Sequence, residues 1–461
     1  MGRSERDSPT WPLWLLPGLA LGLLMGPYQW MSELGFVLQQ RLWPLLGLAA
    51  GRQQIQAALP KGLAPGLVFV ATAALLALAW GPLASGRGGG LSALLAMNQR
   101  QASTEDAVPR PWLRQLAPIS QLQRLLLLVL THVGGLTVGV ESPSAALGAT
   151  ALLAWRKRSG ARHPLNRMPL ELVGVIGAAA GLGAAFRSPL LGVLYGIEEL
   201  DRRSRRQLVV PVLLLAGAGS LIATTLGQPA RLPGPNFGVL PMGLWPWTLL
   251  LTLAGACLGA LLVRALIPLA DLVKHQMALR RWTLVLSLSA LLTLLAIASD
   301  GLSLNDGSLS LAAALQGAPG GGPLTFLWRA LATLLSVAAG APGGIMHDTM
   351  TLGALLVTPL HQLAGLDQVS LAQLAAVGAT ALFAGANGTP IFCAVFVFTL
   401  QGNPASLPQL LLVSAVSASL AAPLRGEEWN QHQANGLLAS ILASSETATH
   451  ERDQPSGGRA P

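Results

Sequence analysis

Long stretches without Asp, Glu, Lys or Arg follow one another along the chain, separated by short segments that carry most of the charges. Such stretches after the N-terminal region include 62–86, 207–230, 232–263, 282–299, 307–328 and 368–424. Because a helix needs about 20 apolar residues to cross a bilayer, the pattern predicts membrane-spanning helices, at least two of them in the last stretch. Pro and Gly interrupt nearly every stretch, which predicts that many of these helices are short, tilted or broken.

The composition favours an all-α polytopic membrane protein over a soluble one. Hydrophobic residues make up 52% of the 461 residues and charged residues 11%, and the mean hydropathy is +0.54. A soluble globular protein carries about 25% charged residues, so this chain has too few polar side chains to cover a water-soluble particle. The two cysteines, Cys257 and Cys393, both lie in apolar stretches, and we predict packing roles for them.

The net charge of +9 is concentrated in short segments. Basic residues cluster at 156–167 and at 202–206, which is typical of the short cytoplasmic loops of membrane proteins. We therefore predict a multi-pass protein integral to a lipid bilayer, the plasma (inner) membrane of a prokaryote, with no nucleic acid partner.

Two motifs occur twice at nearly the same spacing. The segment that begins at Gly139 (Gly-Val-Glu-Ser-Pro) aligns with the one that begins at Gly344 (Gly-Ile-Met-His-Asp), an offset of 205 residues (344 minus 139). The segment around Pro189 aligns with the one around Pro390, an offset of 201 residues (390 minus 189). Duplicated halves with interrupted helices are typical of transporters that bind their substrate between the halves, near the bilayer midplane.

The repeat predicts how the chain is organised. Residues 1–58 form an N-terminal segment with the first helices, residues 59–230 the first transmembrane half, and residues 231–426 the second. Residues 427–461 form a C-terminal helix and a disordered tail, because this segment is polar and ends in a sequence rich in Gly and Pro.

Three glycine-rich segments, which start at Ser85, Gly139 and Gly340, predict helices that open inside the membrane. The first N–H groups of such a helix have no partner within the helix. Together with the positive end of the helix dipole, they can bind an anion without a cationic side chain. A cation site would instead need carboxylates or converging carbonyl groups, and the spans contain few acids. We therefore predict an anion site.

Two glutamates are candidates for proton transfer. Glu141 lies at a helix opening, in a long interval without another acid. It is either a plain helix cap or a gate that competes with the anion and leaves the site when it is protonated. Glu199 ends an apolar helix directly before a basic cluster, and is either a solvated interfacial acid or a proton entry point on the cytoplasmic side.

Other polar residues near the breaks are candidates for lining the pore. Arg87 either draws anions toward the first opening or extends its charge to the membrane surface. His347 and Asp348 could form a hydrogen-bonded pair in an aqueous vestibule. The histidines are scattered without ligand spacing, so we expect neither a metal site nor a cofactor.

The three openings, together with residues 181–200, resemble the CLC family of chloride channels and chloride/proton antiporters. The likeness runs from about residue 60 to about residue 445. It implies an inverted repeat of tilted and broken helices, with one pore in each subunit of a homodimer. It also implies that Glu141 is the gating glutamate and Glu199 the internal proton-transfer glutamate.

The resemblance further assigns anion-binding residues to all three openings, with a serine hydroxyl at the first and backbone N–H groups at the others. These residues are Ser85, Gly86, Gly139, Val140, Gly344, Ile345 and Met346. The sequence departs from the family pattern where Val140 and Ser142 replace Arg and Gly, and where Gly88 and Asp348 replace prolines. The family's pore tyrosine has no counterpart near the last helix, where its position falls on Ala434 or Asn435, and Asn435 is the candidate pore-lining residue. A missing phenol would open the inner side of the anion site.

The sequence therefore predicts a transporter that exchanges chloride for protons. A passive chloride channel and a carrier of another small anion remain alternatives. An intramembrane enzyme would need a nucleophile or a metal constellation, which the sequence does not offer, so we expect no enzymatic activity. A purely structural membrane protein would not need polar breaks in both halves.

Overall fold

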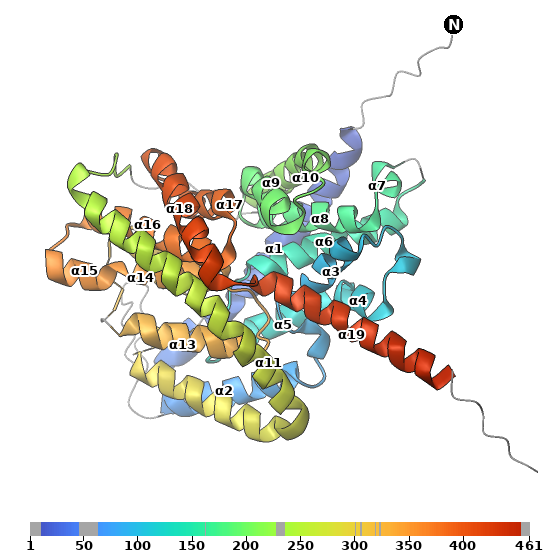
Figure 1. The fold of residues 1–461 in the computed structure, drawn as a ribbon, viewed down its shortest axis with the longest axis horizontal. Helices are drawn as coiled ribbons and strands as arrows, with labels where there is room; N and C mark the ends of the chain where they lie inside the picture. Colours follow the sequence, from blue (N-terminus) through green and yellow to red (C-terminus); the bar gives the residue numbers. More distant parts are fainter. Residues whose placement is uncertain are drawn as a thin grey trace, which may run out of the picture.

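The computed structural model describes residues 11–45, 63–161, 163–226, 236–299, 301–304, 307–318, 320–321 and 324–452. Within these ranges the chain is helical, and its β-type pairing consists of one isolated bridge (Figure 1). The predicted all-α class is confirmed. The disordered tail that the sequence predicts lies outside the described residues from 453 onward, as do residues 1–10 and 46–62.

The helices of the first part of the chain include several that are too short to cross a bilayer. They are α1 (Pro12–Leu45), α2 (Leu63–Ala79), α3 (Ser92–Arg100), α4 (Arg110–Gln115), α5 (Pro118–Val133), α6 (Glu141–Arg158), α7 (Pro164–Arg167), α8 (Leu170–Ala185), α9 (Pro189–Tyr195) and α10 (Arg205–Thr225). A 3₁₀ turn, η1 (Ala84–Gly86), precedes α3, and a π-helical turn, η3 (Gly196–Leu200), extends α9.

The second part of the chain repeats this mixture of long and short helices. They are α11 (Trp245–Ala298), α12 (Ser308–Leu315), α13 (Thr325–Ala338), α14 (Met346–Leu355), α15 (Val357–Ala364), α16 (Gln368–Asn387), α17 (Pro390–Gln401), α18 (Leu407–Arg425) and α19 (Trp429–Arg452). The backbone of α11 leaves the helical region at Arg280 (φ −139°, ψ 54°), so this helix joins two of the predicted apolar stretches through a kink.

Length and composition divide the apolar helices into two groups. Four described segments are long and apolar enough to cross a membrane: Arg205–Thr225, Met242–Ala298, Gln368–Asn387 and Pro404–Arg425. Four shorter ones have the same apolar character: Pro65–Ala79, Leu170–Ala185, Thr325–Ala338 and Pro390–Gln401. This combination confirms the predicted membrane protein with broken helices, because half-length helices need a partner to complete a crossing.

The two halves pack their helices in the same way. In the first half α8 packs against α6, α9 and α10, and in the second half α16 packs against α14, α17 and α18. Both α8 and α16 are buried over most of their length. Gly148 of α6 lies against the carbonyl of Gly177, and Gly353 of α14 lies against the carbonyl of Gly378, so close that neither position has room for a Cβ atom. Small residues therefore allow the same close helix approach in both halves.

The bridge between the halves joins the two residues that the repeat aligns. Gly139 N donates to Gly344 O at 3.0 Å, and Gly344 N donates to Gly139 O at 3.2 Å. In Figure 1, α17 and α18 lie beside α9 and α10, their counterparts in the first half. The inverted repeat is thus joined at the start of α6 and α14, while the exact limits of the two halves stay a prediction.

Large apolar side chains cover the outside of the helix bundle. Leu249, Leu253 and Leu294 of α11, and Leu412 and Leu420 of α18, are exposed. A soluble protein rarely exposes such a continuous apolar surface, whereas lipid tails solvate it without cost. The basic residues stand at helix ends, since Arg156, Lys157 and Arg158 end α6 and Arg205 and Arg206 begin α10.

Candidate functional site

The openings of α6 and α14 lie side by side at the Gly139–Gly344 bridge. Val140 is the N-cap residue of α6 and Ile345 that of α14, and neither helix has a side-chain hydrogen bond to its cap. The first turns of both helices are buried. Two sets of helix N–H groups therefore point into the protein interior without a side-chain partner, which gives this junction a positive electrostatic character.

The first glycine-rich opening reaches the same junction through Gly88 and Gly89. Gly88 N donates to Gly340 O at 3.1 Å, directly before the third opening. A Cβ atom on Gly89 would lie 2.6 Å from the Cβ of Ser142 and 3.4 Å from the carbonyl oxygen of Gly343. The glycine at position 89 is therefore required for the three openings to meet.

Ser85 and Gly86, the predicted binding residues of this opening, turn toward a different helix. Ser85 is exposed and its hydroxyl donates to the side-chain oxygen of Gln123 on α5. Gly86 is buried, and a Cβ atom there would lie 2.6 Å from the backbone nitrogen of Arg124, also on α5. The physical reason is that α3 begins only at Ser92, so the residues at its opening are Gly89 and Gly90, several positions further along the chain.

Ser142 provides the hydroxyl group that lies among the openings. Its side chain is 4% exposed and lies in contact with the Cα side of both Gly89 and Gly344. Ser142 is one of the departures from the family motif, and the sequence alone assigns it no role. The signal that could have found it is the serine itself, which stands directly after Glu141 where the family motif has glycine.

Glu141 and His347 form a buried pair across the junction. His347 Nδ1 lies 2.7 Å from Glu141 Oε1, and the two side chains are 9% and 0% exposed. Glu141 Oε2 accepts no hydrogen bond from the described residues, and it lies directly against Gly139. The predicted partnership of His347 with Asp348 is wrong, because successive residues at the start of a helix point in different directions.

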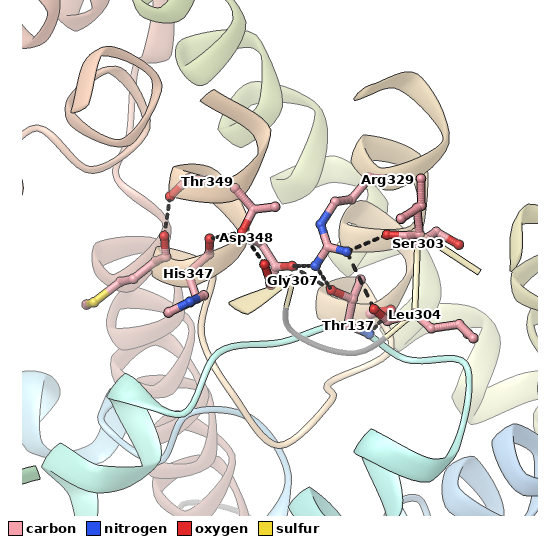
Figure 2. A network of polar contacts seen from close by, with 12 residues as sticks. Thr137, Ser303, Leu304, Gly307, Arg329, His347, Asp348 and Thr349 are labelled. Carbon is pink, nitrogen blue, oxygen red and sulfur yellow. Dashed lines mark hydrogen bonds and ion pairs between the residues drawn. The ribbon is translucent and has the colours of Figure 1, made fainter. Parts of the chain in front are cut away.

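Asp348 instead belongs to a second buried network, which Figure 2 shows around the guanidinium of Arg329. Arg329 Nη2 lies 3.2 Å from Asp348 Oδ1 and 3.1 Å from Thr137 Oγ1, and both charged side chains are fully buried. Thr137 Oγ1 donates to Asp348 Oδ1 at 2.5 Å, and Thr137 N donates to Ser336 Oγ at 3.0 Å. The network therefore ties the first turn of α14 to the segment that leads into α6.

Glu199 lies between two asparagines from distant parts of the chain. Asn430 Nδ2 of α19 donates to Oε1 at 2.6 Å, and Asn387 Nδ2 of α16 donates to Oε2 at 2.9 Å. The neighbouring Glu198 accepts hydrogen bonds from the backbone N–H groups of Ile391 (3.2 Å) and Phe392 (2.6 Å) and so caps α17. Neither Asn387 nor Asn430 is a candidate from the sequence alone, because only the fold brings them to Glu199.

Tyr195, the last residue of α9, is a buried phenol on which both glutamates act. Its side chain is fully buried, and its ring packs against Phe392 with a centroid distance of 5.1 Å. The charges of Glu199 and Glu141 both act on its phenol, whose oxygen forms no hydrogen bond within the described part of the chain. A buried hydroxyl group therefore lies within electrostatic range of both candidate glutamates.

Arg87 and Asn435 differ in how close they lie to the openings. Arg87 is half-buried, its Nη1 lies 3.5 Å from Met277 Sδ, and a Cβ atom on Gly340 would lie 2.8 Å from its Nη2. Its guanidinium therefore lies beside the third opening. Asn435 is exposed on α19 and donates to Glu427 Oε1 at 2.6 Å, so it does not face the pore.

Among the described residues, no group of three His, Cys, Asp or Glu side chains converges as a metal site would require.

Comparison with known proteins identifies the class of this membrane protein. The family model described as "Voltage gated chloride channel" matches residues 69–422, which is most of the chain. The chain therefore belongs to this family of membrane proteins, to which the sequence analysis assigned it under the name CLC.

Individual relatives agree with this assignment. The chain is 27% identical over 340 residues to the H(+)/Cl(-) exchange transporter ClcA of Salmonella typhimurium, covering 69% of this chain and 68% of the relative. It is 28% identical over 342 residues to the protein of the same name from Citrobacter koseri, covering 70% and 69%. Both relatives are bacterial.

Solved structures share the fold. A slow cyanobacterial Cl-/H+ antiporter superposes with a TM-score of 0.72 at 20% identity, covering 95% of this chain and 99% of that one. A CLC-type fluoride/proton antiporter superposes with a TM-score of 0.69 at 18% identity, covering 91% and 96%. The predicted inverted repeat of tilted and broken helices is thus confirmed.

Proposed function

We propose that this protein exchanges chloride for protons across the plasma (inner) membrane of a prokaryote. The observation that carries the proposal is the junction of two buried, uncapped helix N-termini with one carboxylate, Glu141, at the first residue of α6. Helix N–H groups favour a small anion, and a carboxylate that competes for them can exchange places with it. The names of the bacterial relatives support the same pair of ions.

The anion is bound mainly by the backbone. The N–H groups of Val140 and Glu141 on one side, and of Ile345 and Met346 on the other, supply the donors, because Gly139 N and Gly344 N are used in the bridge. The hydroxyl of Ser142 adds a side-chain donor, because it lies between Gly89 and Gly344. Arg87 lies beside the third opening and raises the local anion concentration without a direct bond.

Protons follow a separate route on the inner side. Glu199 takes up a proton beside the basic segment 202–206, held in place by Asn387 and Asn430. The buried phenol of Tyr195, on which the charges of both Glu199 and Glu141 act, offers a hydroxyl group for the transfer. Protonated Glu141 loses its attraction for the helix N–H groups and yields the site to chloride, which couples the two movements.

Two alternative functions each differ from chloride/proton exchange in one property. A passive chloride channel would move chloride without protons, and it gains support from the missing pore tyrosine. A carrier of another small anion gains support from the structural similarity to a fluoride/proton antiporter, which shares the fold. Both alternatives keep the same anion site.

We also propose a homodimer, as the family resemblance implies. Leu190 at the start of α9 and Ile391 at the start of α17 are 56% and 45% exposed, and they occupy equivalent positions in the two halves. Their helices lie side by side and present one apolar surface that a second copy can cover. Chemical crosslinking in membranes, followed by mass determination in detergent, distinguishes a dimer from a monomer.

The exchange is tested with purified protein in liposomes. A chloride gradient is imposed while chloride efflux and external pH are recorded together. Exchange predicts that chloride leaving the vesicles drives protons inward, even against a proton gradient. Chloride efflux without a pH change would favour the channel, and efflux of fluoride alone would favour the other carrier.

A further inference from the structure

The gate contains a second titratable group, contributed by the other half of the molecule. Glu141 opens α6 and His347 lies in the first turn of α14, and their side chains are 2.7 Å apart in a buried environment. The Gly139–Gly344 bridge fixes the separation of the two backbones. The pair is therefore a consequence of the repeat junction itself and not of a flexible surface contact.

The pair holds the carboxylate away from the helix N–H groups. Glu141 Oε2 lies against Gly139 and accepts no hydrogen bond from the described residues, while Oε1 is bonded to the imidazole. The N-termini of α6 and α14 have no side-chain cap. The carboxylate thus has two competing partners, the imidazole of His347 and the N–H groups that also suit an anion.

The position of His347 is fixed by its surroundings. Its carbonyl oxygen accepts a hydrogen bond from Thr351 Oγ1 at 2.9 Å, and the next residue, Asp348, is held by Arg329 and Thr137. Because these contacts hold the first turn of α14, the imidazole stays in place when the Glu141 carboxylate moves. His347 can therefore bind the carboxylate in one position and release it to another.

Three sets of charged or titratable groups surround the pair. Asp348 of α14 pairs with Arg329 of α13, Arg87 lies beside Gly340 at the third opening, and Tyr195 is under the influence of both Glu141 and Glu199. Asp348 and Arg329 neutralise each other. A single proton shared by Glu141 and His347 makes the pair neutral overall, which is the state that a buried site of low dielectric constant favours.

We propose that His347 is a positioning residue of the gate: it holds the Glu141 carboxylate outside the anion site for as long as the two side chains share a proton. Loss of that proton leaves the pair with a net negative charge, and the carboxylate moves to the helix N–H groups and excludes chloride. Acidification therefore opens the site and alkalinisation closes it. This inference rests on the proposed exchange function.

Two substitutions of the histidine separate this role from a structural one. His347→Ala removes the bond, so the carboxylate occupies the anion site more often, and chloride turnover in liposomes at neutral pH falls about tenfold, the effect expected for one hydrogen bond to a charged group. His347→Asn places an amide nitrogen where Nδ1 lies. It recovers most of the lost turnover, but its pH profile is flatter than that of the wild type because the amide does not titrate.

The double variant decides whether the effect passes through Glu141. In a Glu141→Gln background, the further change His347→Ala leaves chloride turnover unaltered, because no carboxylate remains to be held. An undiminished tenfold loss in that background would overturn the inference, and so would a single His347→Ala variant with the turnover and pH profile of the wild type.

Infrared spectroscopy tests the pair independently of transport. The carboxyl band of Glu141, identified by its absence from Glu141→Gln, is titrated in detergent for the wild type and His347→Asn. A shifted midpoint in His347→Asn supports the pair even if wild-type vesicles carry no chloride, a result that would overturn only the proposed exchange. Identical midpoints would overturn the role of His347.

Discussion

The two helix openings that meet at the Gly139–Gly344 bridge have the same backbone arrangement but different side chains. α6 begins with Glu141, followed by Ser142, whereas α14 begins with Met346, followed by His347. The opening of α6 carries a carboxylate with an oxygen that no described residue bonds, and the opening of α14 is held by a buried ion pair. The two halves therefore share one backbone arrangement, whereas their side chains make the opening of α6 movable and the opening of α14 rigid.

Contacts at the junction also explain two departures from the family pattern, one in each opening. Asp348 stands where the resemblance leads us to expect proline, and it anchors α14 through Arg329 and Thr137. Ser142 stands where glycine is expected, and it lies opposite Gly89. Each change is matched by a partner on another segment, so the junction keeps its shape with a different set of residues.

The largest effect is expected from the movable opening. Glu141→Gln removes the group that both competes with chloride and carries the proton, so proton movement falls to the background of empty vesicles while chloride still flows. Chloride flux and pH recorded together in liposomes check this outcome. Glu105→Gln, an exposed acid bonded to Lys157, is the matched control and keeps its proton coupling. Coupled proton movement that persists in Glu141→Gln would exclude Glu141 as the gate.

The rigid opening is tested through its ion pair. Asp348→Ala leaves Arg329 buried without its partner, and this lowers the free energy of unfolding by about 3–5 kcal/mol. Thermal unfolding in detergent measures the loss. Lys157→Ala breaks an exposed ion pair of 2.6 Å and costs at most about 1 kcal/mol. Equal stability of the two variants would show that the buried pair does not hold α14.

A smaller effect is expected where the first and second openings touch. Ser142→Ala removes the hydroxyl beside Gly89 and weakens chloride binding about fivefold, which corresponds to ~1 kcal/mol for one hydrogen bond. Ser85→Ala changes it little, because Ser85 bonds to Gln123. Titration calorimetry with chloride compares the two variants. A larger loss of chloride affinity in Ser85→Ala than in Ser142→Ala would show that Ser85, and not Ser142, provides the hydroxyl group that binds chloride.

The smallest effect concerns the inner glutamate. Asn430→Ala removes one of the two amide groups that orient Glu199 and slows proton movement about threefold, ~0.7 kcal/mol, because Asn387 still holds the other oxygen. Asn435→Ala on the same helix is the control and leaves the proton rate unchanged. Proton rates that respond to Asn435 and not to Asn430 would contradict this assignment.

The sequence predicted the features that depend on local pattern. Uncharged stretches predicted the apolar helices, and the aligned glycines predicted the two residues that form the bridge, because a backbone that opens inside a membrane needs the same residues in both halves. The candidate position at Glu141 came from an acid in an otherwise uncharged context, and the one at Glu199 from an acid that ends an apolar helix before a basic cluster.

The features that the sequence did not predict depend on the three-dimensional packing. The Ser-Gly pair at 85–86 matches the expected motif, but α3 begins at Ser92, so the glycines after Arg87 occupy the junction. His347 and Asp348 are adjacent in sequence and bond to different partners far away in the chain. Side-chain direction at a helix start depends on the backbone geometry, which a motif comparison does not contain.

The central claim is that helix N–H groups at the Gly139–Gly344 junction hold a small anion. Anomalous diffraction from crystals grown with bromide in place of chloride tests it most directly. The account predicts a bromide peak within hydrogen-bond distance of the Ile345 and Met346 N–H groups and the Ser142 hydroxyl, stronger in Glu141→Gln than in the wild type. A junction without bromide in Glu141→Gln crystals, with bromide bound instead at Ser85 or at the basic segment 202–206, would contradict it.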